Sequence, residues 1–134
     1  MRLNELLDFE KGNEEVSIDD LNALERYLDR FYKNVGLDID IHGRHFLERI
    51  NDARNGKQIT IAELKNLFGE VFNKYAENIS KKGDDFQGVL VKMTSDINVP
   101  FVIHWDNKNK EFDLKAKTIM RKKGFQTNDP KFVV

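Results

Sequence analysis

A change in hydrophobic periodicity after Gly83 constrains the fold of this chain more than any other feature. Before this glycine, apolar residues recur at steps of three and four, the spacing of one face of an α-helix. After it, apolar and polar residues alternate, which is typical of strands with one buried face. Helices and strands therefore occupy separate parts of the chain. This segregation predicts an α+β fold rather than a parallel α/β fold.

About three helices are expected before Gly83, preceded by a short leading helix that ends in the polar stretch 11–16. The expected ranges are 17–36, 43–55 and 61–82. Ser17 and Asp20 have a spacing related to the capping box, and Thr60 and Glu63 form a standard one. Between the first two helices, residues 37–41 alternate apolar and acidic side chains. They are either a short strand or an extended lead-in to the next helix.

A small antiparallel sheet of three to four strands is expected after Gly83. Residues 86–94 fit a strand, with a short helix as the alternative, and residues 99–105 alternate cleanly. Turn-forming residues 106–109 then lead into a return strand that extends to about residue 121. Residues 132–134 can add an edge strand. Residues 1–134 are expected to form one domain, with an acidic helical part (1–36) and a helix-plus-sheet core (37–134).

Composition excludes several functional classes. The chain has no cysteine, so disulfides, thiolate catalysis and cysteine-based zinc sites are ruled out. No apolar stretch is long enough for a membrane span, and the N-terminus lacks the apolar core of a signal peptide. We therefore expect a cytoplasmic protein without a membrane partner. No phosphate-binding or dinucleotide motif is present, and the histidines lack zinc-site spacing, so no cofactor or metal is expected.

Charge is distributed unevenly although the net charge is only −1. Residues 1–40 hold eleven acidic residues against five basic ones, whereas residues 114–134 hold six basic residues and one acidic residue. Such polarity can mark an electrostatic binding face for a polyanion or a protein partner. The alternative is ordinary scatter of charges that folding brings back together. The basic candidates for contacts with a nucleic acid are Lys115, Lys117, Arg121, Lys122 and Lys123.

His45 and Arg49 are the strongest candidates for chemistry. They are four residues apart in an expected helix, so their side chains are neighbours on one face. A histidine can transfer a proton near neutral pH, and an adjacent guanidinium can bind a phosphate. This pair therefore suits phosphodiester cleavage. The alternative is a solvated helix edge on which Arg49 pairs with an acid such as Glu48 or Asp52.

The segment 42–55, HGRHFLERINDARN, resembles the H-x-L-x-R helix of phage RegB-type endoribonucleases. It is also similar to helices of the barnase–EndoU–colicin–RelE group, which includes ParE- and BrnT-like proteins and places such a helix before an antiparallel sheet. The resemblance implies catalytic roles for His45 and Arg49. It further implies a later Thr or Ser with a basic residue, matched here by Thr118 with Arg121 or Lys122. His104 would have to serve as the second histidine.

The sequence thus leads to a metal-independent endoribonuclease of phage or toxin type, acting on RNA in the cytoplasm of a phage-infected host. One alternative is a non-enzymatic phage virion, assembly or host-takeover protein that contacts a protein partner through its acidic N-terminal helices. Another is a nucleic-acid-binding protein without catalysis. Catalysis requires His45, Arg49 and His104 to converge on one open surface, whereas the alternatives allow them to scatter.

Overall fold

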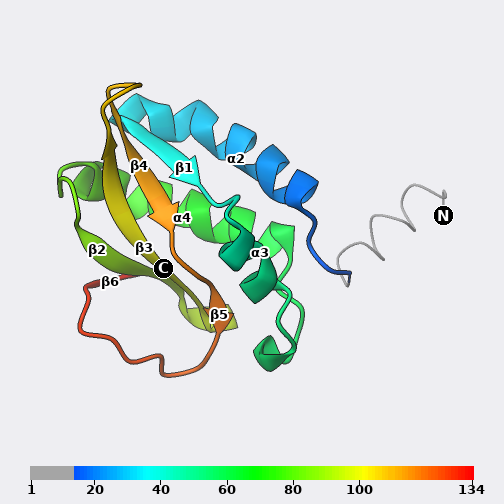
Figure 1. The fold of residues 1–134 in the computed structure, drawn as a ribbon. Coiled ribbons are helices and arrows are strands. Elements are labelled where there is room, and N and C mark those ends of the chain that lie inside the picture. Colours follow the sequence, from blue (N-terminus) through cyan, green and yellow to red (C-terminus); the bar gives the residue numbers. More distant parts are fainter. Residues whose placement is uncertain (1–13) are drawn as a thin grey trace.

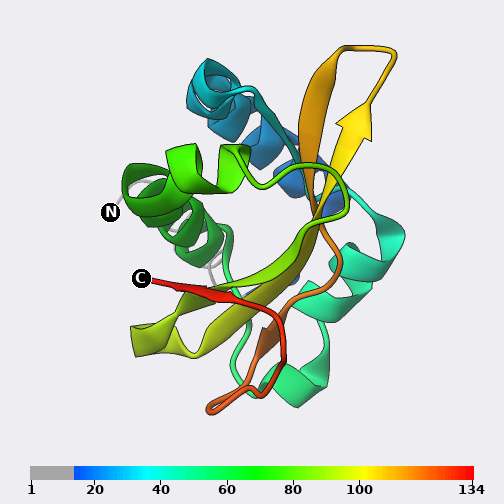
Figure 2. The same cartoon turned by 90° about the vertical axis from the view of Figure 1, so that its left-hand side faces the viewer.

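The computed structural model describes residues 14–134, and the expected leading helix lies outside these residues. Helices α2 (Ile18–Tyr32) and α4 (Ile61–Ser80) pack against one face of a sheet, and α3 (Arg44–Ile50) is shorter (Figures 1 and 2). The predicted α+β class is therefore confirmed. No helix within residues 14–134 is long and apolar enough to cross a membrane.

The two long helices begin at complete capping boxes. The hydroxyl of Ser17 accepts a hydrogen bond from the Asp20 N–H, and the Asp20 carboxylate accepts one from the Ser17 N–H. Thr60 and Glu63 make the same reciprocal pair at the start of α4. These bonds satisfy N–H groups that have no partner within a helix. The apolar stripes of both helices are buried against each other and against the sheet.

The second helix ends earlier than the sequence predicts. α3 stops at Ile50, and the chain continues into a short 3₁₀ helix at Ala53–Asn55. Asp52 explains this break, because its side chain caps the 3₁₀ helix by accepting the Arg54 N–H at 2.8 Å. Asn51 is held in place by two hydrogen bonds with the backbone of Val16.

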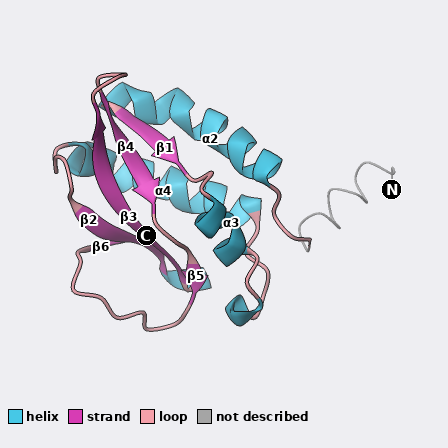
Figure 3. Cartoon of the chain, viewed as in Figure 1, coloured by secondary structure: helices cyan, strands magenta, loops and turns pink. Residues whose placement is uncertain are grey.

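The sheet is larger than predicted, and it is mixed rather than antiparallel (Figure 3). The strands within the described residues are β1 (Leu37–Asp40), β2 (Gln87–Lys92), β3 (Ile97–Asp106), β4 (Glu111–Ala116), β5 (Met120–Arg121) and β6 (Lys131–Val133). Their order is β1-β4-β3-β2-β6, with β5 paired to β3. β1 and β6 cause the difference, because each pairs in parallel, with β4 and β2 respectively. Residues 37–40 are thus a strand rather than a lead-in.

The predicted return strand is divided into two. β4 ends at Ala116, and β5 pairs separately with the start of β3. Ile119, between these two strands, is buried at 1% exposure. The side chain of Asn98, also buried, donates to the carbonyl oxygen of Lys122 at 2.9 Å and so holds the chain after β5. This division positions residues 118–122 beside α3, where they line a pocket.

Candidate functional site

A pocket of about 570 Å³ lies between the α3–3₁₀ segment and residues 118–122. Its lining is rich in cationic and polar side chains: His45, Arg49, Asp52, Arg54, Asn55, Thr118, Ile119, Met120, Arg121 and Lys122. Asn55 joins the two walls, since its side chain donates to the Arg49 carbonyl oxygen and accepts from the Arg121 N–H. The structure thus brings five sequence-predicted residues together, namely His45, Arg49, Thr118, Arg121 and Lys122.

His45 and Arg49 lie one turn apart on α3, which carries both into the pocket lining. His45 is exposed to solvent, and the Arg49 side chain is 38% exposed. Asp52 holds two guanidinium groups at the pocket, with Arg49 Nη1 at 3.2 Å and Arg54 Nη2 at 2.7 Å from its Oδ2. One carboxylate is therefore shared by two cations, which leaves the pocket suited to an anion.

Arg121 lines the pocket but has no N–H donor left for a ligand. Its guanidinium donates to both oxygens of Glu63, at 2.9 and 3.1 Å. The remaining donors reach the carbonyl oxygens of Lys57, Gln58 and Ser95. These five contacts use all five N–H groups of the side chain. Arg121 therefore fastens β5 to α4 and the loop before it.

The contact with Arg121 affects the pKa of Glu63. Burial alone would raise its pKa, but hydrogen bonds from Arg121 and from the Thr60 N–H lower the pKa of Glu63 below its ordinary value. The ionised carboxylate is thus the form that the fold stabilises. Glu63 serves both the capping box of α4 and the anchorage of β5.

Thr118 and Lys122 complete the polar wall opposite α3. Thr118 is partly buried, whereas Lys122 is exposed, with its backbone fixed by a hydrogen bond to Asp96. A hydroxyl and an ammonium group at these positions can both donate to phosphate oxygens.

His104 lies apart from the pocket. It stands on the exposed side of β3 opposite Asp113 in β4, and its Nδ1 is 4.0 Å from Asp84. Met120, in the pocket lining, pairs with Asn98 of β3. Asn98 is six residues before His104, and six residues of strand span about 20 Å. His45 and His104 are therefore not brought together at one phosphate.

The other basic candidates do not form a continuous strip with the pocket. Lys117 donates to the Gln87 side chain at 2.6 Å, and Lys115 pairs in register with Val102 and Asp40. Neither residue lines the pocket, nor does the exposed Lys123. Of the predicted nucleic-acid contacts, Arg121 and Lys122 are the two at the pocket.

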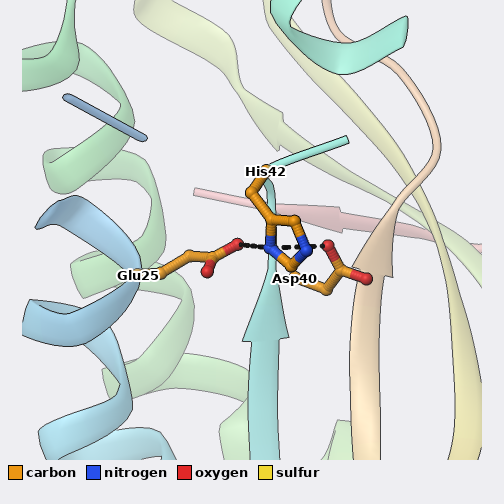
Figure 4. Close-up of side chains that lie close together, drawn as sticks. All are labelled: Glu25, Asp40 and His42. Atoms are coloured by element: carbon orange, nitrogen blue, oxygen red, sulfur yellow. Dashed lines mark hydrogen bonds and ion pairs between the residues drawn. The ribbon is translucent and has the colours of Figure 1, made fainter. Parts of the chain in front are cut away.

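A second group of side chains, Glu25, Asp40 and His42, meets where α2 passes the end of β1 (Figure 4). His42 Nδ1 lies 2.6 Å from Glu25 Oε2 and 3.3 Å from Asp40 Oδ1. The hydrogen bond with Glu25 raises the pKa of His42 above its ordinary value, and the charge of Asp40 acts in the same direction.

Sequence reasoning did not single out this second group. Glu25 is fifteen or more residues from the other two members and comes from a separate helix. A signal was nevertheless present, because the alternation of residues 38–42 places Asp38, Asp40 and His42 on one side of an extended chain. The sequence did not indicate that α2 packs along the open edge of β1, which brings Glu25 to this group.

Carboxylates are also crowded on the neighbouring outer side of β1 and β4. Carboxylate oxygens of Asp38, Glu111 and Asp113 all lie within 4.8 Å of one another. Burial, together with the negative charges of Asp38 and other nearby acids, raises the pKa of Asp113 to about 6. The basic pocket and this acidic surface are thus separate regions of the same sheet-and-helix framework.

Comparisons with protein-family models, curated proteins and solved structures found no match to this chain.

Proposed function

We propose that the protein is a small metal-independent endoribonuclease that holds an RNA phosphodiester in the pocket between α3 and residues 118–122. The observation that supports this most is the meeting of His45 and Arg49 with Thr118 and Lys122 around one cavity. The volume of this cavity is in the usual range of small-ligand sites. Its cationic lining suits a phosphate group, and the exposed His45 can exchange protons.

In this proposal His45 accepts the proton of the ribose 2′-hydroxyl. The 2′-oxygen then attacks the adjacent phosphorus, and the bond from phosphorus to the 5′-oxygen breaks. The products are a 2′,3′-cyclic phosphate and a 5′-hydroxyl, whose proton comes from water. The protonated His45 then returns its proton to the hydroxide that this water leaves. Arg49 and Lys122 offset the negative charge that develops on the phosphate oxygens, and Thr118 donates a hydrogen bond to one of them. Neither Arg121 nor His104 takes part.

A nucleic-acid-binding protein without catalysis is the second candidate. Two observations favour it: the donors of Arg121 are all occupied, and His104 lies far along β3. Because His104 lies elsewhere, His45 is the one histidine in the pocket lining, and no second imidazole is there to donate a proton to the leaving oxygen. Binding by Arg49, Arg54 and Lys122 would weaken steeply with salt, because counterions are released from the phosphates.

The test is an RNA cleavage assay in EDTA, read together with RNA binding by fluorescence anisotropy. We expect the wild type to release products that end in a cyclic phosphate. His45→Ala should reduce the cleavage rate by at least about a hundredfold while RNA binding changes little. Arg49→Ala and Lys122→Ala should weaken binding as well as cleavage.

His104→Ala is the matched control, because it removes an exposed histidine outside the pocket. It should leave both cleavage and binding unchanged. Salt-sensitive binding without any product, with or without magnesium, would establish the second candidate in place of the first. Absence of both binding and cleavage would refute each of them.

A further inference from the structure

We propose that Glu25, Asp40 and His42 form a binding site for a divalent transition-metal ion of the Zn²⁺ class. The site is distinct from the pocket, and its role is to join α2 to the chain between β1 and α3. It is independent of the proposed cleavage of RNA, which uses other residues.

The three ligand atoms all lie within 4.8 Å of one another, close to the spacing that such an ion requires. Zn²⁺ binds histidine nitrogen and carboxylate oxygen at about 2.0–2.2 Å, so neighbouring ligands around it are about 3.0–3.5 Å apart. His42 Nδ1 and Asp40 Oδ1 are already separated by 3.3 Å. The 2.6 Å contact between His42 Nδ1 and Glu25 Oε2 must open slightly. The His42 side chain is 55% exposed and free to make this adjustment.

The Glu25 carboxylate is held in place before any ion binds, and the Asp40 side chain is partly buried. The Ile41 N–H donates to Glu25 Oε2 at 2.7 Å, so the backbone fixes the oxygen that faces His42. Glu25 and Asp40 are only 14% and 24% exposed. Hydrogen bonds from the surrounding protein to the ligand side chains, like the one from Ile41, orient the ligands of metal sites. Figure 4 shows the two carboxylates on opposite sides of the imidazole ring.

The local charge also favours a cation. Among residues 14–134, the ion pairs of Glu25 and Asp40 are made to His42 alone. A neutral imidazole leaves two uncompensated carboxylates there. Further negative charge lies nearby on Asp38 and Asp113, and an ion would neutralise part of it. The repulsion among these groups is a cost that a divalent cation reduces.

The mixture of ligand types indicates which ion is bound. Imidazole is a preferred ligand of Zn²⁺, Ni²⁺ and Cu²⁺, whereas Mg²⁺ and Ca²⁺ prefer oxygen ligands alone. Three protein ligands leave at least one coordination position for water. We therefore expect Zn²⁺ to bind more tightly than Mg²⁺.

The consequence for the fold follows from where the ligands originate. Glu25 belongs to α2, Asp40 ends β1, and His42 immediately precedes Gly43, the N-cap of α3. An ion held by all three cross-links these elements. Because it binds the folded chain and not the dispersed ligands of the unfolded chain, it should raise the thermal unfolding temperature.

The test is calorimetric titration of the EDTA-treated, dialysed protein with ZnCl₂ and with MgCl₂ at slightly alkaline pH, together with thermal unfolding followed by circular dichroism. We expect one Zn²⁺ per chain, a higher unfolding temperature with Zn²⁺, and a much smaller effect of Mg²⁺. His42→Ala and Asp40→Asn should each weaken Zn²⁺ binding at least about tenfold.

His104→Ala serves as the matched control, because this exposed histidine also lies within ion-pair distance of an aspartate, Asp84, at 4.0 Å. It should bind Zn²⁺ like the wild type. Circular dichroism of the variants without metal verifies that they fold. Equal Zn²⁺ affinity of the wild type and His42→Ala would overturn the proposal, as would binding that disappears in Asp113→Asn but persists in His42→Ala. Failure to bind any Zn²⁺ would overturn it too.

Discussion

At Gly88 a single additional methyl group would meet two buried aromatic rings. A Cβ atom there would lie 2.9 Å from Phe101 Cζ and 2.9 Å from Phe132 Cε2. Phe101 is fully buried and Phe132 is 7% exposed, so neither ring can move into solvent. The glycine in β2 is therefore required by the close approach of these rings across the core face of the sheet.

We expect Gly88→Ala to lower the free energy of unfolding by about 1–3 kcal/mol, because the overpacked rings must shift. Urea unfolding followed by circular dichroism measures this change. Gly69→Ala is the matched control, since Gly69 lies within α4 and no atom beyond its chain neighbours and the nearby helix backbone is within 4 Å of the added Cβ. It should stabilise the protein by about 0.5–1 kcal/mol through helix propensity. A stable Gly88→Ala protein would contradict the packing argument.

Elements that carry their own signals were predictable from the sequence. α2 and α4 have apolar stripes and capping boxes at fixed spacings, and the alternation of residues 99–105 indicates the inward face of β3. Each of these signals is local. α3 was predicted too long because the capping of the 3₁₀ helix by Asp52 competes with continuation of the helix.

Features that depend on distant pairing were not predictable. The parallel pairing of β1 with β4 joins Leu37 to Phe112, and no local pattern specifies that register. The contact of Arg121 with Glu63 could not be predicted either, because the two residues are 58 positions apart in the chain. The location of His45, Arg49 and Thr118 around one pocket likewise depends on the break between β4 and β5.

The contact between Arg121 and Glu63 determines how β5 is attached to α4. In Glu63→Gln, the partly buried guanidinium of Arg121 would lose its charged partner, and the capping box would lose its carboxylate. We expect the free energy of unfolding to fall by about 2 kcal/mol. Amide hydrogen exchange should also become faster at residues 119–122. Chemical denaturation and hydrogen-exchange mass spectrometry measure the two effects.

Glu77→Gln is the matched control for this change. Glu77 pairs with Lys81, the C-cap residue of the same helix, but both side chains are largely exposed, at 81% and 73%. Its loss should alter the free energy of unfolding by less than about 0.5 kcal/mol. Unchanged hydrogen exchange at 119–122 in Glu63→Gln would show that β5 is held by other contacts.

For the whole molecule, partly buried aspartates with raised pKa values make the free energy of unfolding depend on pH. Burial raises the pKa of Asp29 to about 6, and the nearby Asp38 adds to the effect despite the hydrogen bond from the Ile39 N–H. Asp113 is raised similarly, by burial and by the charges of Asp38 and other acids. Two carboxyl groups on one side of the molecule thus disfavour ionisation in the folded state.

The sign of the pH dependence follows from proton linkage. Between the ordinary aspartate pKa of 3.8 and about 6, the folded state binds more protons than the unfolded state at Asp29 and Asp113. Stability contributed by these groups therefore falls as the pH rises through that window. Glu63 acts oppositely, because its pKa is lowered and its contribution is lost in acid below the ordinary value of 4.5. Together these groups favour maximal stability on the acid side of neutrality.

Asp113→Asn tests the acidic side of this balance. At neutral pH the substitution removes a negative charge that faces Asp38 across the β1–β4 pair. The Oδ1 atom of Asp113 is also buried without a hydrogen-bond partner among residues 14–134. We expect the free energy of unfolding to rise by about 1 kcal/mol at neutral pH, after allowance for partial solvent exposure. The gain should shrink as the pH falls towards 3.8 and vanish well below it, where Asp113 is protonated in both states of the wild type.

Urea unfolding of the two proteins in EDTA across the acid-to-neutral range measures this difference. The stability of Asp113→Asn should then depend less on pH between about 4 and 6 than that of the wild type. A constant difference at every pH would mean that Asp113 acts through packing instead of charge. A lower stability of Asp113→Asn at neutral pH would show that its carboxylate is stabilised by a contact that outweighs the repulsion from Asp38.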